Sequence, residues 1–468
     1  MASFAGIRLA ASGLAAARAG MEVTGQNIAN QATTGYTRQR VDQAPVGAPG
    51  ATGLWPSVLR VGGGVDVTAI ARLGDEVLDA RVRDALATSG YWSARATAAG
   101  QAEVTMAEPT EDGLAANLDR FWAGWSDLAN NPDSATAQVV LNNAQVLVGQ
   151  IAAGYHAIAG QWEGLRGQVD RQVADVNATA GRVAVLNTQI REAVQSGRNA
   201  NELIDQRNLL AQQLSTAVGA TGTVEADGTL TVRVDGNALV SGDRARAITA
   251  AGPRDIADSG RVTLEWADRP GVAVSVTGGT IGGTISTLAP ASDGGTLAAV
   301  AQAYNDTAVA LADTVNAIHR SGETAGGAAG GDFFALYPAG PPALGLSVIP
   351  AGLDELALAA PGAGPLDTTI ADRISALSAS AVSASKTWSD FVTGFGVTVA
   401  GDLQRADIAD TGAVAAVASQ QSSASVDGDE ETINLLTYQT AYQASARVLT
   451  AMDEALDLLI NRTGLVGR

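Results

Sequence analysis

The sequence predicts a mainly α-helical protein with an inserted β-rich domain. Apolar residues recur at helical spacing near both ends of the 468-residue chain and in its inner segments. From Gly219 onward the pattern changes to alternating apolar and polar residues with glycine turns, which is typical of short strands. Because a chain that leaves a helical body and returns to it brings its ends together, we expect the two terminal helices to pair as a coiled coil beside a long helical body.

The N-terminal helix is predicted from a heptad series. Four apolar residues are spaced by seven: Ile7, Leu14, Met21 and Ile28. Three positions after the first three of these stand smaller residues, which let another helix approach closely: Ala10, Ala17 and Thr24. Taken alone, this segment fits an ordinary amphipathic helix of a globular core better than a coiled coil.

The C-terminal helix carries a longer stripe of the same design. Its residues are spaced alternately by three and four: Leu435, Tyr438, Tyr442, Ser445, Leu449, Met452, Leu456 and Leu459. Asp427 and the acidic run 429–431 come just before it, where a helix N-terminus favours negative charge. Gly464 is the expected stop. Neither terminal helix can bury its stripe alone, so each is a candidate to cover the other.

Inner segments of the chain also show helical periodicity. We expect helices over residues 72–108, 113–156 and 160–217, with breaks near 108–109, at 130–134 and at 196–201. Asp133 or Ser134 is expected to cap the helix that follows the second break. Further helices are expected over 295–319 and from 370 to the end, with an interruption near 395–402.

The β-rich insertion is expected in stretches that alternate and turn. Two Asp-Gly turns, at 227–228 and 235–236, punctuate the first meander, and residues 261–279 predict a hairpin with Pro270-Gly271 in its turn. Residues 344–365 are expected to add strands to the same region. The expected domains are a terminal coiled-coil domain (1–60 with 420–468), a helical body (61–218 with 293–335 and 371–419) and an outer β domain (219–292 with 336–370).

Composition argues against several classes of function. The net charge is −19, and the arginines are scattered with a single lysine, Lys386, which disfavours nucleic acid and anionic membrane surfaces. The absence of cysteine excludes disulfides and thiolate metal sites. The sequence contains no run of about 18 apolar residues, so no membrane-spanning helix is expected. Arg18 interrupts a weak similarity of the N-terminus to a cleaved signal peptide.

No group of residues suggests catalysis, a cofactor or a metal ion. His156 and His319 lack neighbours at metal-ligand spacing, and we interpret them as a packed helix residue and as a cation near a helix C-terminus. The segment "VGGGV" (61–65) is interpreted as a turn, and "EPTED" (108–112) as surface charge. "GDFF" (331–334) is expected to close the helical body against the β domain.

Two terminal segments together resemble a known family. The N-terminal "GLAAARAGMEVTGQNIANQATTGYTRQR" (13–40) is similar to the signature shared by bacterial flagellar rod, hook and hook-associated proteins. The C-terminal "ETINLLTYQTAYQASARVLTAMDEALDLLINR" (431–462) resembles the partner signature. The hook-associated branch is favoured by the long helical block and by inner segments: "NELIDQRNLLAQQLSTAVG" (201–219), "TVNAIHRSG" (314–322) and "GGDFFAL" (330–336).

The resemblance implies a structural role in a tube of many copies. Its terminal helices are expected to pack along the tube axis, with the helical body around them and the β domain facing solvent. The implied N-terminal packing residues are Ile7, Leu14, Met21, Asn27, Ile28, Asn30, Thr34, Gly35 and Tyr36. The implied C-terminal residues, for subunit packing or for a chaperone, are Leu435, Tyr438, Tyr442, Leu449, Met452, Leu456 and Leu459.

The same resemblance implies partners and a location. We expect a ring of copies at the junction between hook and filament, needed for filament assembly, with the hook subunit below and a second junction protein above. A cytosolic export chaperone is expected at the C-terminal helix. Export is expected through the flagellar type III apparatus, without a cleaved signal peptide, to the extracellular flagellum.

Three alternatives stay open at this point. A hook or rod subunit shares both ends but should lack the long central helices and the segment Asp205-Gln206-Arg207. An enzyme on a helical scaffold, such as a wall-degrading hydrolase, needs two carboxylates facing each other in a cleft. A generic coiled-coil adaptor explains the heptads but explains neither the matched ends nor the inserted β domain.

Overall fold

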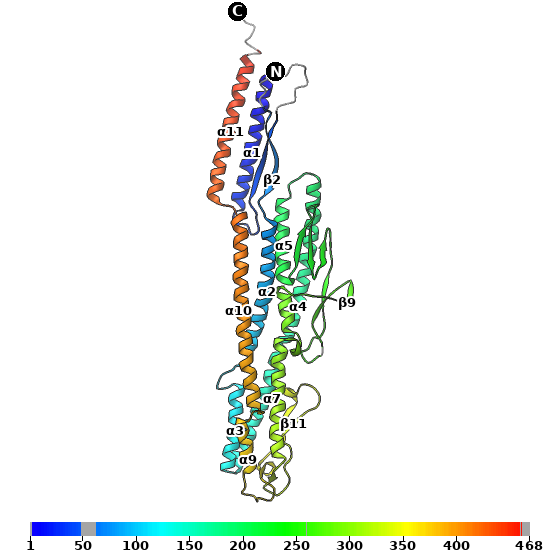
Figure 1. Ribbon diagram of the computed structural model, residues 1–468, viewed down its shortest axis with the longest axis vertical. Helices are drawn as coiled ribbons and strands as arrows, with labels where there is room; N and C mark the ends of the chain where they lie inside the picture. The colour runs from blue at the N-terminus through cyan, green and yellow to red at the C-terminus, as the bar shows by residue number, and fades with distance from the viewer. Residues whose placement is uncertain (1, 48–61, 259, 459, 461–468) are drawn as a thin grey trace, which may run out of the picture.

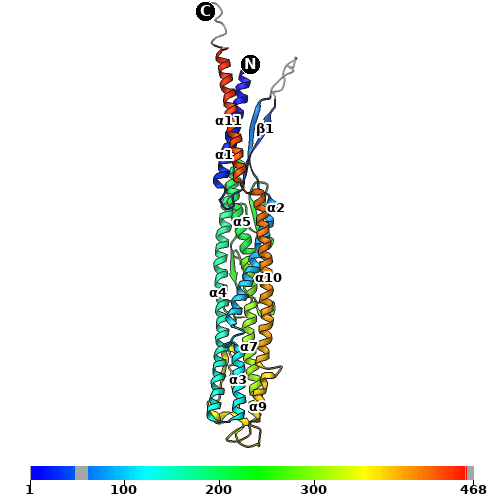
Figure 2. The same cartoon turned by 90° about the vertical axis from the view of Figure 1, so that its left-hand side faces the viewer.

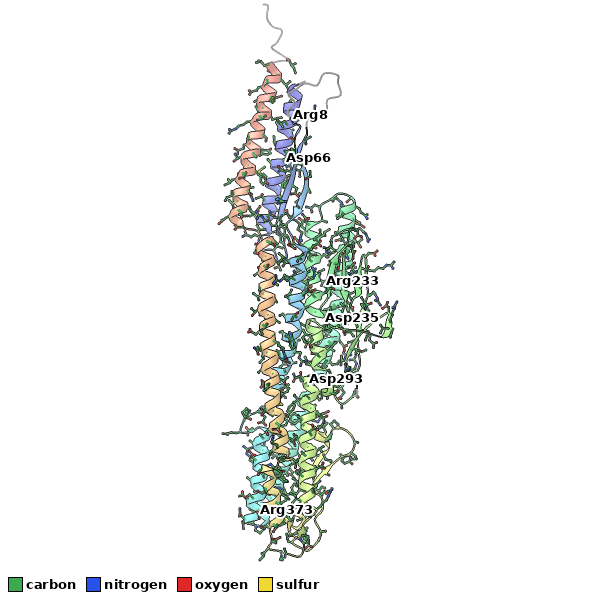
Figure 3. The ribbon with its side chains drawn as sticks, in the orientation of Figure 1. Arg8, Asp66, Arg233, Asp235, Asp293 and Arg373 are labelled. Atoms are coloured by element: carbon green, nitrogen blue, oxygen red, sulfur yellow. The ribbon has the colours of Figure 1, made fainter. Side chains whose placement is uncertain are left out.

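The computed structural model describes residues 2–47, 62–258, 260–458 and 460. The molecule is a long rod in which a pair of terminal helices extends one end of a helical body (Figure 1). In Figure 3, Arg8 and Asp66 mark this terminal unit, whereas Arg373 lies toward the opposite end of the rod. The expected boundary between residues 60 and 61 falls at the edge of a segment outside the described residues.

The terminal unit contains both ends of the described chain. Helices α1 (Ala2–Asn30) and α11 (Gly428–Asp457) lie side by side in both ribbon views (Figures 1 and 2). The predicted pairing of the two terminal helices is therefore confirmed. Strands β1 (Gln39–Val46) and β2 (Gly64–Arg72) form an antiparallel hairpin that packs on α1. This hairpin was not predicted, and its second strand takes residues expected to be a turn and the start of a helix.

The body is built from long helices that run along the rod. They are α2 (Glu76–Met106), α3 (Leu114–Asn130), α4 (Ser134–Gln195), α5 (Asn201–Val218), α6 (Gly279–Thr287), α7 (Thr296–His319), α9 (Thr369–Ser375) and α10 (Ala384–Ala424). Asp133 caps α4 as predicted, accepting hydrogen bonds from the backbone N–H groups of Ala135 and Thr136. Helix α4 then continues unbroken for 62 residues.

The prediction of an interruption near 395–402 is wrong, because α10 is helical throughout these residues. Phe395, Val399 and Asp402 follow helical spacing and are all buried. Asp402 accepts a hydrogen bond of 3.0 Å from Nε of Arg95 on α2. Packing on α2 thus stabilises a helix whose local sequence, rich in glycine and β-branched residues, favours other conformations.

The first β region lies along α4. An antiparallel sheet joins β3 (Thr221–Val224), β4 (Leu230–Val234), β5 (Asn237–Ser241) and β6 (Arg244–Ala245), and a second joins β7 (Ile248–Ala251), β8 (Thr263–Trp266) and β9 (Arg269–Val274). The two amide side chains of α4 that hold these strands are Asn187, bonded to the backbone of Leu230, and Asn177, bonded to that of Ile248. The β region is therefore fastened to the body by side-chain bonds to strand backbone.

Two details of this region differ from expectation. The turn between β8 and β9 falls at residues 267–268, and Pro270-Gly271 lies inside β9. Strand β9 is at the edge of its sheet, where a proline is tolerated because no neighbouring strand needs its N–H. Helix α6 occupies residues expected to belong to the outer β domain and packs on α2 and α5.

The later strands do not join this β region. Strands β10 (Glu323–Thr324) and β13 (Ala357–Ala359) pair with each other, as do β11 (Phe334–Leu336) and β12 (Leu346–Val348), with the short helix α8 (Pro342–Gly345) between the last pair. They lie toward the far end of the rod with α3 and α9 (Figure 1). The expectation of a single inserted β domain is therefore corrected to two separate β regions.

An aromatic cluster holds the far end together. Phe333 and Phe334 are buried and their rings contact Phe121 of α3, while Phe333 also meets Trp125. The segment "GDFF" therefore closes the helical body, as expected, but its rings pack on α3, which corrects the expectation that it does so against the outer β domain. His319, expected to act as a cation, is buried here, where Nε2 accepts a hydrogen bond of 3.0 Å from the N–H of Ala357. It is a neutral acceptor in this position.

Candidate functional site

Helices α1 and α11 meet in an antiparallel register marked by glycines. Gly6, Gly13 and Gly20 of α1 face Met452, Ser445 and Tyr438 of α11, respectively. The residue numbers of these contacts rise by seven along α1 and fall by seven along α11, so the same kind of contact recurs every two helical turns. A Cβ atom built on Gly20 would lie only 2.4 Å from Cδ1 of Tyr438. The absence of side chains at these positions is what allows the close approach.

The predicted heptad residues flank these contacts. Ala10, Ala17 and Thr24 are buried, as their small size predicted. The following are partly buried: Ile7, Leu14, Met21, Leu435, Tyr438, Leu449, Met452 and Leu456. Ile28 and Tyr442 are more open, at 37% and 36% exposed, and Leu459 lies outside the described residues. The sequence contained a signal for the closest contacts that was overlooked, namely three glycines spaced by seven.

Asn27 continues the same register and is the centre of a buried polar site. Its side-chain amide donates to the carbonyl oxygen of Gln39 at 2.9 Å and to Oε2 of Glu431 at 3.1 Å. Its Oδ1 accepts from the hydroxyl of Tyr36 at 2.9 Å and from the N–H of Gln39 at 3.0 Å. All four hydrogen-bonding positions of the amide are used in a site that is 1% exposed, which explains the choice of asparagine.

Arg38 connects the same loop to the start of α11. Its guanidinium pairs with Glu431 at 2.7 Å and with Glu430 at 2.8 Å, and its backbone N–H donates to the carbonyl oxygen of Ala424 at the end of α10. Burial opposes the charged form of Arg38, but the two carboxylates outweigh it and raise its pKa. The loop after α1 is thereby tied to both helices at the C-terminal side.

Asp205 of α5 connects the loop to the body. Its carboxylate accepts from the backbone N–H of Thr37 at 2.9 Å and from Nε of Arg72 at 2.6 Å. Arg72 also lies 3.9 Å from Asp79 of α2, whose carboxylate accepts from Asn208 and from Gln420 of α10. One network therefore joins the terminal unit to α2, α5 and α10.

The remaining predicted N-terminal packing residues border this network. Asn30 bonds back to the carbonyl oxygen of Gln26 and accepts from the hydroxyl of Thr33, and Gly35 has a φ of 81°, which favours glycine. Thr34 is exposed. Thr33, Thr34, Gly35 and Tyr36 line a cleft of about 520 Å³ with α5 and the end of α10. Tyr36 is half-buried there, and burial and the carboxylates of Glu202, Asp205 and Glu431 raise its pKa to about 12.

We call the hydrogen-bonded network around Asn27, Arg38 and Asp205 the joint, because it links the terminal unit to the helical body. Asp79 and Asp205 both line the cleft, but each accepts hydrogen bonds from donors on other elements, so they serve as links between elements. Across the described part of the chain, no group of three or more histidine or carboxylate side chains is arranged to hold a metal ion. Within the same part, no helix is long and apolar enough to cross a membrane. His156, expected to be packed, is exposed on α4.

Family models match three parts of the sequence. The model for the flagellar hook-associated protein FlgK helical domain matches residues 99–334, which is half of the chain. Models for the flagella basal body rod protein and for the flagellar basal body rod FlgEFG protein C-terminal region match residues 7–37 and 421–462. The two rod models thus cover the segments that pair in the terminal unit.

Similar whole proteins carry the same description. The chain is 27% identical to flagellar hook-associated protein 1 of Bacillus subtilis, covering 100% of this chain and 99% of that protein. It is 30% identical to the Escherichia coli protein of the same name, over 70% of this chain and 60% of that protein. A solved structure of the flagellar hook junction protein FlgK from Burkholderia pseudomallei matches 55% of this chain and 46% of its own, with 26% identity and a TM-score of 0.48. This protein belongs to the flagellar hook-associated protein FlgK family.

Proposed function

We propose that this chain is a structural subunit of the bacterial flagellum at the junction between hook and filament, where it is needed for filament assembly. The observation that carries the proposal is the terminal unit, in which the two ends of the chain form one slender pair fixed to the body by a buried polar joint. Such a pair suits a subunit that must align with many copies along one axis. The proposed mechanism is docking of helices, without bond chemistry.

The exposed side of α11 supports contact with other copies. Ile433, Leu436 and Val448 are exposed apolar side chains of this helix, which in the single chain packs mainly on α1. Apolar side chains exposed together often mark an interaction surface. We assign subunit packing to this side of α11 and to the predicted terminal residues, and we assign the same helix to an export chaperone before assembly.

The remaining partners and the location follow from the same proposal. Copies of the chain form a ring, with the hook subunit below and the second junction protein above. The protein reaches the extracellular flagellum through the flagellar type III apparatus, without a cleaved signal peptide. In this proposal, the terminal unit lies in the inner tube, the helical body surrounds it, and the sheets along α4 face solvent.

A clean chromosomal deletion tests the role. We expect hooks without filaments, loss of swimming, and unpolymerised flagellin in the medium. The alternative is a rod or hook subunit, for which the deletion strain would lack hooks altogether. The models that match both chain ends do not favour this alternative, because such subunits share these ends, whereas the match of residues 99–334 to the helical-domain model supports the junction role. Normal flagella and swimming would contradict both candidates.

Complementation with matched variants tests the surface of α11. Val448→Glu on α11 and Val272→Glu on β9 make the same change at positions that are 43% and 48% exposed. Both should leave the fold of the purified chain intact, because both side chains are already open to solvent. We expect only Val448→Glu to fail in restoring filaments. Equal restoration by the two variants would contradict the assignment of this surface.

A further inference from the structure

A second cleft, next to the joint, is lined by three arginines. Its volume is about 350 Å³, and it lies between the start of α2, helix α5 and strand β3. Arg72, Arg83 and Arg207 all contribute to its lining. Arg83 is 6% exposed and Arg207 is 2% exposed, so two of the three side chains are almost completely buried.

The two buried arginines have neutral partners. Arg207 donates to the carbonyl oxygen of Gly228 at 2.6 Å and to Oδ1 of Asn208 at 3.1 Å. Arg83 donates to the carbonyl oxygen of Gly222 at 3.4 Å, which is a long contact. Among the described residues, neither guanidinium forms an ion pair with a carboxylate. A guanidinium has five N–H donors, so both have donors to spare toward the cleft.

The carboxylates near the cleft are engaged elsewhere or lie at its opening. Asp79 lines the cleft, but its oxygens accept from Asn208 and Gln420 and face Arg72. Glu76 is exposed and lines the cleft at the first turn of α2. Burial of charge without an opposite charge is unfavourable, so a bound anion would stabilise this arrangement.

The protonation state of the buried pair is consistent with anion binding. Burial, together with the positive charges of Arg72 and Arg83, lowers the pKa of Arg207 to about 10. Burial also lowers the pKa of Arg83, against the opposing effect of Asp79, Asp84 and Glu76. Arg207 therefore still carries its charge at neutral pH, where Arg72 and Arg83 repel it and Glu76 and Asp79 attract it.

We infer that this cleft binds an oxyanion, a phosphate or a carboxylate group, between the guanidinium groups of Arg83 and Arg207. Planar guanidinium groups match both anions with paired hydrogen bonds. The anion would bridge α2 and α5 at the end of the body that carries the terminal unit. This inference does not depend on the proposed function, since it concerns the purified single chain.

Inorganic phosphate is the probe for the test. Urea unfolding of the full chain is followed as phosphate replaces chloride at constant ionic strength. At a hundredfold excess of phosphate over its Kd, the unfolding equilibrium constant should fall about 100-fold. Phosphate also stabilises proteins by general exclusion from their surface, so the effect of interest is the difference between variants.

Two arginines of α2 provide matched variants. Arg83→Gln should remove the specific effect of phosphate, whereas Arg81→Gln, at an exposed position two residues away, should retain it. Glu76→Gln should increase the effect, because it removes a negative charge beside the bound anion. Line broadening of the phosphate ³¹P signal should follow the same order and does not depend on stability. Equal phosphate responses in Arg83→Gln and Arg81→Gln would overturn the inference.

Measuring self-association of the chain distinguishes two sources of the anion, a carboxylate of a second copy and free phosphate. If a carboxylate of a second copy occupies the cleft, phosphate should weaken association of the wild-type chain, and Arg83→Gln should associate less. If free phosphate is the occupant, association should not respond to phosphate while the stability effect remains. Both results support the site. If neither stability nor association responds to phosphate through Arg83, the inference is wrong.

Discussion

The glycine register between α1 and α11 gives the sharpest test of the terminal unit. Gly20→Ala places a methyl group where the structure leaves 2.4 Å to the ring of Tyr438. Gly25→Ala makes the same change on the same helix, at a position with no atom within 4 Å of the new Cβ. The two variants therefore share the gain in helix propensity and differ in packing.

The expected magnitudes have opposite signs. Replacing glycine by alanine inside a helix stabilises it by about 1 kcal/mol. Forcing an extra methyl group into a packed contact costs about 1–3 kcal/mol. Gly25→Ala should therefore raise the free energy of unfolding by about 1 kcal/mol. Gly20→Ala should range from neutral to about 2 kcal/mol destabilising, because its packing cost offsets the gain.

Urea unfolding of the purified full chain, followed by far-ultraviolet circular dichroism, measures both variants. Tyr438→Ala in the Gly20→Ala background should recover part of the loss, since the ring that the methyl group meets is gone. A double-mutant cycle isolates this coupling. If Gly20→Ala stabilises the chain as much as Gly25→Ala, the antiparallel register is wrong.

Three further predictions concern the joint and the far end. Asp205→Asn should lower the free energy of unfolding by about 1.5–3 kcal/mol, because it removes a buried charge-assisted bond to Arg72. Asp268→Asn, in an exposed ion pair, should not change it measurably. Burial lowers the pKa of His319 below 6.5, so the unfolded chain is protonated first and stability should fall as the pH drops below about 6.5. His319→Gln should reduce this dependence of stability on pH, measured by unfolding curves between about pH 7 and pH 5. Carboxylates stay ionised over roughly this range, so they contribute little to the change. An unchanged pH dependence in the variant would contradict the prediction. Tyr36 has its pKa raised from 10 to about 12, so the unfolded chain loses its proton first. Stability should therefore be full below pH 10 and fall as the pH rises toward 12, and a similar decline in Tyr36→Phe would refute the assignment.

Much of the fold follows from local patterns in the sequence. The heptad residues identified both terminal helices, and Asp133 identified the start of α4. The Asp-Gly turn at 235–236 was also predicted, and both of its residues have positive φ values in the structure. These features depend on residues a few positions apart, so spacing alone carries the information.

The residues of the joint were found through the terminal signature, but their partners were not. Asn27 and Tyr36 were singled out as packing residues, while the buried carboxylates of Glu431 and Asp205 looked like ordinary acidic positions. Asn27 and Glu431 are 404 positions apart in the chain. No local pattern indicates which distant acceptor a buried donor will reach.

The sequence by itself determined the helical ends, the long inner helices and the presence of strands, because each depends on local periodicity and turn chemistry. The tertiary structure decided how these parts meet. It separated residues 221–274 from residues 334–359, which have similar strand patterns, into different β regions. Tertiary packing stabilises α10 as a helix through 395–402. It also places glycines, and not the large apolar residues, at the closest contacts between α1 and α11. Each of these outcomes depends on the shape and charge of surfaces that come together only when the chain has folded.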